Sequence, residues 1–449
     1  MTVVPLPLEQ NQHADTLIHG ADGGSEVRRS VLPGGVRVLT EAMPGQRSAT
    51  IGFWVGVGSR DEAPGQHGST HFLEHLLFKG TKRRTALEIA SAFDEVGGES
   101  NAATAKESTC YFARVLDTDL PMAIDVIADM ITGAVLDPQE MEQERDVILE
   151  EIAMDSDDPT DVAHENFVAA VLGTHPLGRP IGGTPAAIRA VARDSVWDHY
   201  RRYYRPDELV VTAAGGLDHD VVCGLVVDAL HSAGWNLEAA AAPVQRRSTE
   251  RASITGTAGL HVVKRQVEQA NIIMGCPSLV ATDGRRFVMS VLNAVLGGGM
   301  SSRLFQEVRE KRGLVYSTYS FASSYADAGY FGMYAGCTPS KVRQVIDLLG
   351  AELDKLAADG ISEEELRKAE GQLCGGIVLA LEDTGSRMSR LGRAELVSGE
   401  YQDIDETLRQ IKAVTAAEVQ ELARELAAAP RTVTVVGPFE ETETFGLLA

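Results

Sequence analysis

Residues 68–80 read GSTHFLEHLLFKG. Small N-capping residues precede the apolar run and a glycine follows it, so the stretch predicts a short helix. On that helix His71 and His75 lie one turn apart on the same face, which lets both imidazoles reach one metal ion, and Glu74 projects beside them. The stretch therefore predicts two ligands of a metal site with a carboxylate next to them.

Two core histidines that happen to be four residues apart are the alternative interpretation. Phe72, Leu73 and the other apolar side chains of the stretch cover its remaining faces, so we expect the helix to be buried on nearly all sides. Three polar side chains in such a place need strong partners, and a divalent cation supplies one. The metal site is therefore the favoured interpretation.

Composition bounds the class of protein. With 449 residues the chain is too long for one core and suits two domains of about 200 residues each. The apolar runs are too short for a membrane span, and residues 1–26 lack the features of a signal peptide and are expected to be a flexible polar leader. Five scattered cysteines without CxxC spacing indicate a reducing, cytoplasmic setting.

The charge balance points to the kind of partner. There are 41 basic and 64 acidic residues, a formal net charge of −23. This charge repels nucleic acid and anionic membranes and favours cationic partners such as basic peptides, although much of it belongs to an ordinary solvated surface.

The rest of the first half alternates strands and helices. Strands are expected within residues 27–45, where a Pro-Gly-Gly turn joins two of them, and at 48–58, 99–115 (a pair) and 207–216. Helices are expected at 85–96, 119–132, 137–155, 161–172, 195–204 and 219–234. Residues 236–255 have low hydrophobic periodicity and are predicted to be an interdomain linker.

Catalytic zinc normally takes three protein ligands, so two histidines require a third donor. The helix at 137–155 offers several carboxylates, and its apolar residues form two groups, Met141, Ile148 and Ile152 on one face and Val147 and Met154 about a third of a turn away. Glu144 and Glu151 fall between these groups, whereas Glu150 falls on the opposite side. Glu144 and Glu151 are thus the inward-facing pair, and this geometry leaves open whether Glu151 is a ligand or a surface carboxylate.

Other histidines offer further candidate ligands. His67 lies in the loop before the metal helix, and His164, His175 and His199 lie beyond it. None of the last three has metal-ligand spacing to another, so we interpret all four as loop or packing histidines.

The second half looks like a diverged copy of the first. Residues 258–277 are similar to the earlier strands, and residues 283–313 stand where the metal helix stood but carry no HxxEH. Gly297–Gly299 lacks the GxxxxGK[ST] pattern of a phosphate loop and is expected to be a flexible turn. Arg309 and Tyr316 could donate to carbonyl or oxyanion oxygens, although surface and sheet positions are the plainer interpretation.

Together these features resemble the M16 (pitrilysin, or inverzincin) family of zinc metallopeptidases, most closely its two-domain bacterial members and the β subunit of mitochondrial processing peptidase. The resemblance covers about residues 27–438 through the motifs HFLEHLLFKGT, GGESNAATAKEST, ERDVILEEI, HPLGRPIGG, GGGMSSRLFQEVREKRGLVYS and RMSRLGRAEL. It implies an α+β fold of two similar tandem domains, each a mixed β-sheet flanked by helices. A catalytic zinc-binding domain would span 27–235, and an inactive domain that contributes substrate-binding residues would span 256–449.

The resemblance also implies roles for particular residues. It makes His71, His75 and Glu151 the ligands of one Zn²⁺ per chain, Glu74 the general base that activates water, and Glu144 a carboxylate that orients a ligating histidine. It places Asn101 and Ala102 on the strand edge that binds extended substrate. It gives Arg309 and Tyr316 contacts with the substrate backbone and the developing oxyanion.

The implied activity is that of a metalloendopeptidase acting on short or unfolded peptides inside a closed chamber, which a homodimer would form. A non-catalytic subunit that holds peptides is one alternative, although such relatives lose the HxxEH residues. Half of an obligate heterodimer is another, although this chain carries the metal motif together with the glycine, arginine and tyrosine features. Two histidines and one glutamate also suit manganese or cobalt.

Overall fold

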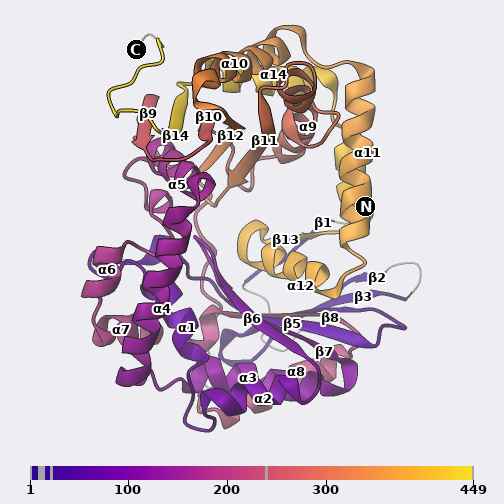
Figure 1. Cartoon of the computed structure of the whole chain (residues 1–449). Coiled ribbons are helices and arrows are strands. Elements are labelled where there is room, and N and C mark those ends of the chain that lie inside the picture. The colour runs from indigo at the N-terminus through magenta and orange to yellow at the C-terminus, as the bar shows by residue number, and fades with distance from the viewer. Residues whose placement is uncertain (1–2, 9–15, 21–23, 238–240, 447–449) are drawn as a thin grey trace. The chain divides into compact units, whose positions relative to one another are not determined.

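The computed structural model describes residues 3–8, 16–20, 24–237 and 241–446, which form two compact units (Figure 1). The first unit comprises Met1–Ile152, Arg179–Arg247 and Leu379–Asp403, and the second comprises Ala153–Gly178, Ser248–Val378 and Ile404–Ala449. The boundary after Arg247 falls inside the predicted linker. The other boundaries mean that each half of the sequence contributes one segment to the unit built mainly from the other half.

A seven-stranded mixed sheet forms the first unit, in the order β2-β3-β4-β8-β5-β7-β6. Its strands are β2 (Thr16–Gly20), β3 (Glu26–Val31), β4 (Arg37–Ala42), β5 (Ser48–Val55), β6 (Glu99–Thr104), β7 (Thr109–Leu116) and β8 (Leu209–Gly215). Strands β4 and β8 pair in parallel, and the other neighbours pair antiparallel. The strands expected from the sequence at 27–45, 48–58, 99–115 and 207–216 are therefore present.

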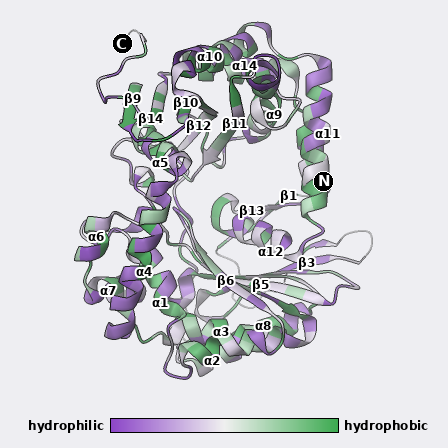
Figure 2. Ribbon diagram, viewed as in Figure 1, coloured by the Kyte–Doolittle hydropathy of each residue, from purple (hydrophilic) through white to green (hydrophobic). Residues whose placement is uncertain are grey.

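The helices of the first unit surround this sheet. They are α1 (Ser69–Leu77), α2 (Ala86–Asp94), α3 (Leu120–Gly133), α4 (Pro138–Asp157, up to Ile152), α6 (Pro185–Ala190), α7 (Arg193–Tyr203), α8 (His219–Ser232) and α12 (Thr384–Arg393). Figure 2 shows hydrophobic residues concentrated in α3 and α8, which share a core with one face of the sheet. Val211 of β8 lies in that core, whereas its neighbour Val210 packs with Leu391 of α12 on the other face. Both faces of the central strands are thus buried.

The second unit repeats the arrangement with a five-stranded sheet in the order β11-β12-β10-β14-β9. Its strands are β9 (Gly259–Lys264), β10 (Ala270–Pro277), β11 (Val315–Ser324), β12 (Gly329–Cys337) and β14 (Thr432–Gly437). Strands β9 and β14 are parallel, and the remaining neighbours are antiparallel. This is the pattern of β4-β8-β5-β7-β6, so the predicted duplication of an α+β unit is confirmed.

Helices cover both faces of the second sheet as well. They are α5 (Pro159–Leu172), α9 (Arg286–Gly297), α10 (Val342–Asp359), α11 (Glu363–Ala380), α13 (Ile404–Lys412) and α14 (Ala416–Ala428), together with a π-helical segment (Phe305–Glu310). Ile272 of β10 packs with Leu349 of α10, whereas Ile273 packs with Phe167 of α5 on the opposite face. Helix α5 comes from the first half of the sequence and α12 from the second, so the two halves exchange the helices that close these second faces.

The structure corrects the prediction of a flexible leader over residues 1–26 for residues 3–8, 16–20 and 24–26, and the other residues of that stretch lie outside the described part of the chain. Strand β1 (Val3–Pro5) pairs with β13 (Glu400–Gln402), and β2 pairs with β3. Leu6, which follows β1, is buried in the core under α12. The sequence pattern could not show this, because a three-residue strand has little periodicity and its partner lies almost 400 residues away.

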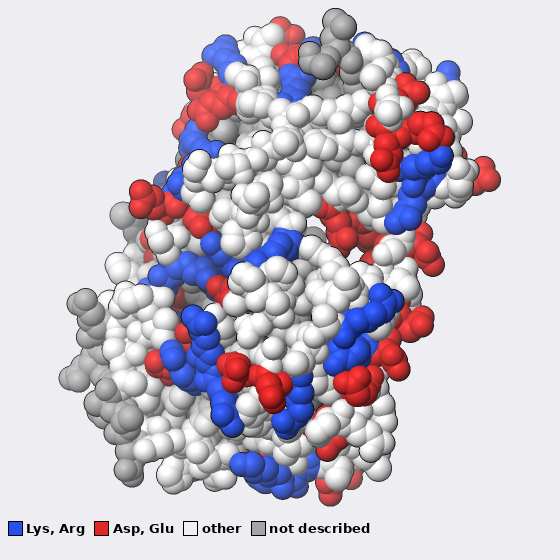
Figure 3. Space-filling view, turned by 90° about the vertical axis from the view of Figure 1, so that its left-hand side faces the viewer, with Lys and Arg blue, Asp and Glu red and all other residues white. Residues whose placement is uncertain are grey.

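Acidic and basic side chains are both present on the surface. On the face drawn in Figure 3 they lie interspersed, and the acidic residues there do not form one continuous patch. Among the described residues, no helix has the length and apolar character needed to cross a membrane.

A fully buried carboxylate ties the exchanged α12 segment to the first sheet. Glu395, which follows α12, accepts from Arg29 Nε at 2.9 Å and from Arg246 Nη2 at 2.8 Å, and Arg37 Nη1 lies 3.7 Å from it. Arg29, Arg37 and Glu395 are each at most 3% exposed. Burial lowers the pKa of Arg37, and the charge of Glu395 opposes this shift.

Glu395→Ala is expected to lower the free energy of unfolding by about 3–5 kcal/mol, because it leaves buried arginines without their carboxylate. Urea unfolding followed by circular dichroism measures the effect. Glu382→Ala, at an exposed glutamate on the same segment, is the matched control and should change stability by about 0.5 kcal/mol or less. Equal midpoints for the two variants would contradict the assignment.

Candidate metal centre

Helix α1 forms as expected, and a carboxylate from the preceding loop caps its N-terminus. Phe72, Leu73 and their apolar neighbours are buried, so the helix is anchored on its non-polar faces. Its N-cap, Gly68, has a left-handed φ of 91° and offers no side-chain cap. The buried Glu62 caps the helix instead, because its carboxylate accepts the backbone N–H groups of Gly68 and Thr70, each at 2.8 Å.

The surroundings of the capping carboxyl shift its pKa. Burial raises the pKa of Glu62, and the hydrogen bonds from Thr70 and Gly68 partly oppose this rise. Behind the helix, the Thr70 hydroxyl lies 3.2 Å from Nε2 of His199, whose pKa burial lowers to about 4. His199 is therefore a neutral packing residue, as the sequence indicated.

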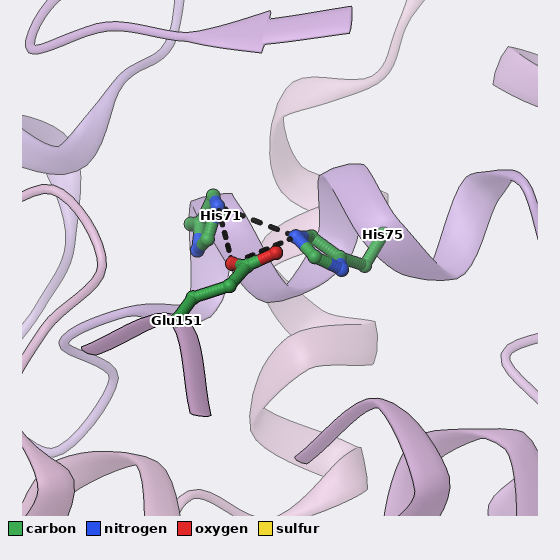
Figure 4. Close-up of side chains that lie close together, drawn as sticks. All are labelled: His71, His75 and Glu151. Carbon is green, nitrogen blue, oxygen red and sulfur yellow. Dashed lines mark hydrogen bonds and ion pairs between the residues drawn. The ribbon is translucent and has the colours of Figure 1, made fainter. Parts of the chain in front are cut away.

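His71, His75 and Glu151 meet at one point (Figure 4). The Nε2 atoms of the two histidines lie 3.3 Å apart, and Oε2 of Glu151 lies 3.7 Å from that of His71 and 3.5 Å from that of His75. Within the described part of the chain, this is the one cluster of three or more such side chains whose ligand atoms all lie within 4.8 Å of one another.

This cluster fits a divalent transition-metal ion. Donors that bind one ion tetrahedrally at roughly 2.0–2.2 Å lie roughly 3.3–3.6 Å from one another. The distances of 3.3 and 3.5 Å fall within that spacing and the third, 3.7 Å, is slightly longer. Two imidazoles with one carboxylate are a donor set that zinc prefers. Glu151 is 43% exposed, which leaves the site accessible from solvent.

Helix α4 supplies both Glu151 and a supporting carboxylate. Oε2 of Glu144 lies 2.9 Å from Nδ1 of His75, and Oε1 accepts from Nζ of Lys79 at 2.6 Å. Burial would raise the pKa of Glu144, but the hydrogen bonds from Lys79 and His75 outweigh it and lower this pKa. An ionised Glu144 favours the Nδ1–H tautomer of His75, which would leave Nε2 free to bind a metal ion.

The facing of α4 matches the helical-wheel prediction in part. Glu144 is buried and Glu150 is exposed, as expected. Val147 and Met154, the second apolar group of the helical wheel, are 43% and 71% exposed. The buried apolar contacts of α4 come from the other group, through Met141 and Ile148.

Glu74 lies on α1 between the two histidines and points toward the sheet edge. The hydroxyl of Thr104 donates to its carboxylate. Thr104 ends β6, the last strand of the sheet, which pairs with β7 along one edge. Among the described residues no strand pairs with the other edge of β6, so its backbone groups are available to an added strand.

Asn101 and Ala102 lie on this edge strand. The amide oxygen of Asn101 accepts the backbone N–H of Ala102 at 2.8 Å. Their strand contacts α1, so the edge runs beside the metal cluster.

Arg309 and Tyr316 lie in the second unit. The Arg309 guanidinium stacks on the rings of Phe305 and Tyr316, with centroid distances of 4.6 and 5.2 Å, and Tyr316 is 76% exposed. The arginine and the tyrosine therefore form one stacked pair, at the end of the π-helical segment and the start of β11.

The remaining histidines lie outside the cluster. His67 contacts Arg179, His164 hydrogen-bonds Tyr319 at 2.8 Å, and His175 lies 3.5 Å from Asp327. Each has a local partner, which agrees with their interpretation as loop or packing residues.

Sequence reasoning missed three residues that support the centre, namely Glu62, Lys79 and Thr104. A signal existed for two of them. Lys79 lies four residues after His75, a spacing that would place it on the same face if the predicted helix continued to Gly80, although α1 ends at Leu77. Thr104 alternates with Ala102 along one face of β6. Glu62 gave no comparable signal, because its link to the helix depends on how the intervening loop folds.

Comparisons with known proteins show which family the chain is similar to. Residues 37–185 match the family described as insulinase (peptidase family M16), and residues 190–373 match the peptidase M16 inactive domain. A Streptomyces coelicolor protein named as an uncharacterized zinc protease is 50% identical over 428 residues, which are 95% of this chain and 93% of that protein. A Mycobacterium leprae protein with the same kind of name is 47% identical over 437 residues, 95% of this chain and 96% of its own.

Solved structures agree on the fold. The crystal structure of a protease from Helicobacter pylori superposes with a TM-score of 0.83 at 22% identity, covering 92% of this chain and all of that one. Both halves of the sequence match domains of one family, and the identity to its members extends over almost the whole length. The chain therefore belongs to peptidase family M16.

Proposed function

We propose that this chain is a zinc-dependent endopeptidase that hydrolyses short or unfolded peptides. The observation that carries the proposal is the meeting of His71, His75 and Glu151 at metal-ligand spacing with Glu74 on the same helix turn. The relatives that are named zinc proteases, at 47–50% identity, support the same metal and reaction.

The chemistry follows from these side chains. His71, His75 and Glu151 would hold the ion, and zinc bound there would acidify a water molecule and polarise the scissile carbonyl. Glu74 takes the proton of the attacking water and passes it to the leaving amine. Glu144 orients His75, and the ammonium group of Lys79 keeps Glu144 ionised.

The open edge of β6 supports the choice of an extended peptide as substrate. A peptide that adds there as a strand exchanges main-chain hydrogen bonds with residues such as Asn101 and Ala102, which gives affinity with little side-chain selectivity. The net charge of −23 favours basic peptides. Arg309 and Tyr316 would donate to the substrate backbone and to the oxyanion of the tetrahedral intermediate.

The motif set of this chain argues against a non-catalytic subunit, because HxxEH, Glu144 and Glu151 are all present. A homodimer that encloses a chamber would restrict the substrates to chains that can enter it. This assembly is part of the proposal and rests on the family resemblance.

Glu74→Gln is expected to abolish cleavage of a quenched, basic fluorogenic peptide while it retains the metal, because the amide cannot accept the proton of water. Both proteins should hold about one zinc ion per chain by elemental analysis. A loss of at least about 10²-fold in kcat with unchanged metal content supports the proposal. A zinc-loaded wild type that leaves a broad panel of unfolded peptides uncleaved would refute it.

Glu144→Gln is expected to weaken zinc binding by about 10–100-fold, because the amide no longer fixes His75 as a carboxylate does. Competition against a fluorescent chelator gives the affinity. Glu150→Gln, at an exposed glutamate on the same helix, is the matched control and should bind zinc as the wild type does. The role of Glu144 would be rejected if both variants bound zinc equally well.

The chain purified alone is expected to elute as a homodimer of about twice its 48.1 kDa mass in size-exclusion chromatography with light scattering. Cleavage by this single-chain preparation would show that no partner chain is needed. An inert monomer that gains activity only with a second polypeptide would contradict the homodimer.

A further inference from the structure

The edge strand of the first sheet contacts the general base directly. We propose that Thr104 is a positioning residue for Glu74, so that the strand that would receive the substrate also fixes the orientation of the base. This inference rests on the proposed function, because it assigns Thr104 a role in the same reaction. It concerns the geometry of Glu74 and not its protonation.

The hydrogen bond itself is the first step of the argument. The Thr104 hydroxyl donates to Oε2 of Glu74, and within the described part of the chain this is the one hydrogen bond recorded for that carboxylate. A glutamate has three rotatable side-chain bonds, and Glu74 is only partly buried, so packing alone does not fix its carboxylate. The hydroxyl therefore selects which way the carboxylate faces.

Thr104 can do this because its own position is fixed. The tip of the β6–β7 hairpin, residues 105–108, is hydrogen-bonded to the loop before α1: Ser59 N–H donates to Ala105 O at 3.2 Å, and Arg60 N–H donates to Lys106 O at 3.0 Å. The approach is so close that a Cβ added at Gly58 would lie 2.3 Å from the carbonyl carbon of Lys106. The strand end that carries Thr104 is thus clamped to this loop.

The same loop holds the helix that carries Glu74. Glu62, in the middle of this loop, caps the first turn of α1 through the N–H groups of Gly68 and Thr70. The loop therefore contacts both the β6–β7 hairpin and α1, and the Thr104–Glu74 hydrogen bond joins the hairpin to the helix directly. Because the two elements are connected twice, the carboxylate of Glu74 has a defined position relative to β6.

This double connection matters for the reaction because a substrate added to β6 is placed by the backbone of the same strand. Strand β6 would then determine both the register of the bound peptide and the orientation of the Glu74 carboxylate. Losing the hydroxyl should leave peptide binding intact but reduce the fraction of bound complexes in which Glu74 faces the attacking water.

Thr104→Val is the sharpest variant, because valine has the shape of threonine, favours strands and lacks the hydroxyl. It is expected to lower kcat by about tenfold with KM changed by less than about twofold, since the lost contact acts in the transition state rather than in binding. Thr104→Ser, which retains the hydroxyl, should restore kcat to within about threefold of the wild type. Thr118→Val makes the same change at an exposed threonine of the first unit outside β6, is the matched control and should leave both constants within about twofold.

Two measurements besides kinetics separate positioning from folding. Bound zinc and the thermal unfolding midpoint should match the wild type in all three variants. Crystal structures of the zinc-loaded wild type and Thr104→Val should show one Glu74 rotamer in the former and a displaced or split carboxylate in the latter.

The outcomes are distinct. If the wild type cleaves, Glu74→Gln does not, and Thr104→Val equals the wild type in kcat, the inference is overturned while the proposed function stands. A Thr104→Val defect that serine does not rescue also overturns it. If the wild type itself is inert, the proposed function fails, and the crystal structures decide the inference: an identical Glu74 conformation in both proteins rejects it, and a displaced carboxylate in Thr104→Val supports the positioning contact.

Discussion

The carboxylate of Glu62 at the N-terminus of α1 is the contact on which the metal centre depends. It satisfies two backbone N–H groups that no side-chain N-cap serves, and its negative charge faces the positive end of the helix. Because it is buried, it holds α1 without competition from water. The Nε2 atoms of His71 and His75 on this helix lie 3.3 Å apart, at metal-ligand spacing.

Other residues around α1 also hold the side chains of the centre in place. Lys79 and Glu144 act on His75 through charge-assisted hydrogen bonds, and the β6–β7 hairpin acts on Glu74 through Thr104. Glu144 joins α1 to α4, and Thr104 joins it to β6. The centre is thus held by the loop that carries Glu62, by α4 and by β6, and it is open toward the exposed side of Glu151.

Duplication and exchange shape the rest of the fold. Both sheets share one strand pattern, and each has a second face that a helix from the other half of the sequence covers. Buried Glu395 and its arginines show the cost of this arrangement, because the charges that fasten the exchanged segment must all be paired inside the protein. The second copy places α9 where α1 stands in the first, and α9 carries neither histidine nor glutamate.

The sequence by itself determined the local features: the metal helix, the inward direction of Glu144, most strands and helices, and the duplication. These follow from periodicity and spacing, which neighbouring residues encode. Only the tertiary structure decided the strands in residues 1–26, the exchange of α5 and α12, the exposure of Val147, and the contacts of Glu62 and Thr104 with α1. Each of these depends on groups far apart along the chain, and a pattern within one segment carries no information about which distant segment will pack against it.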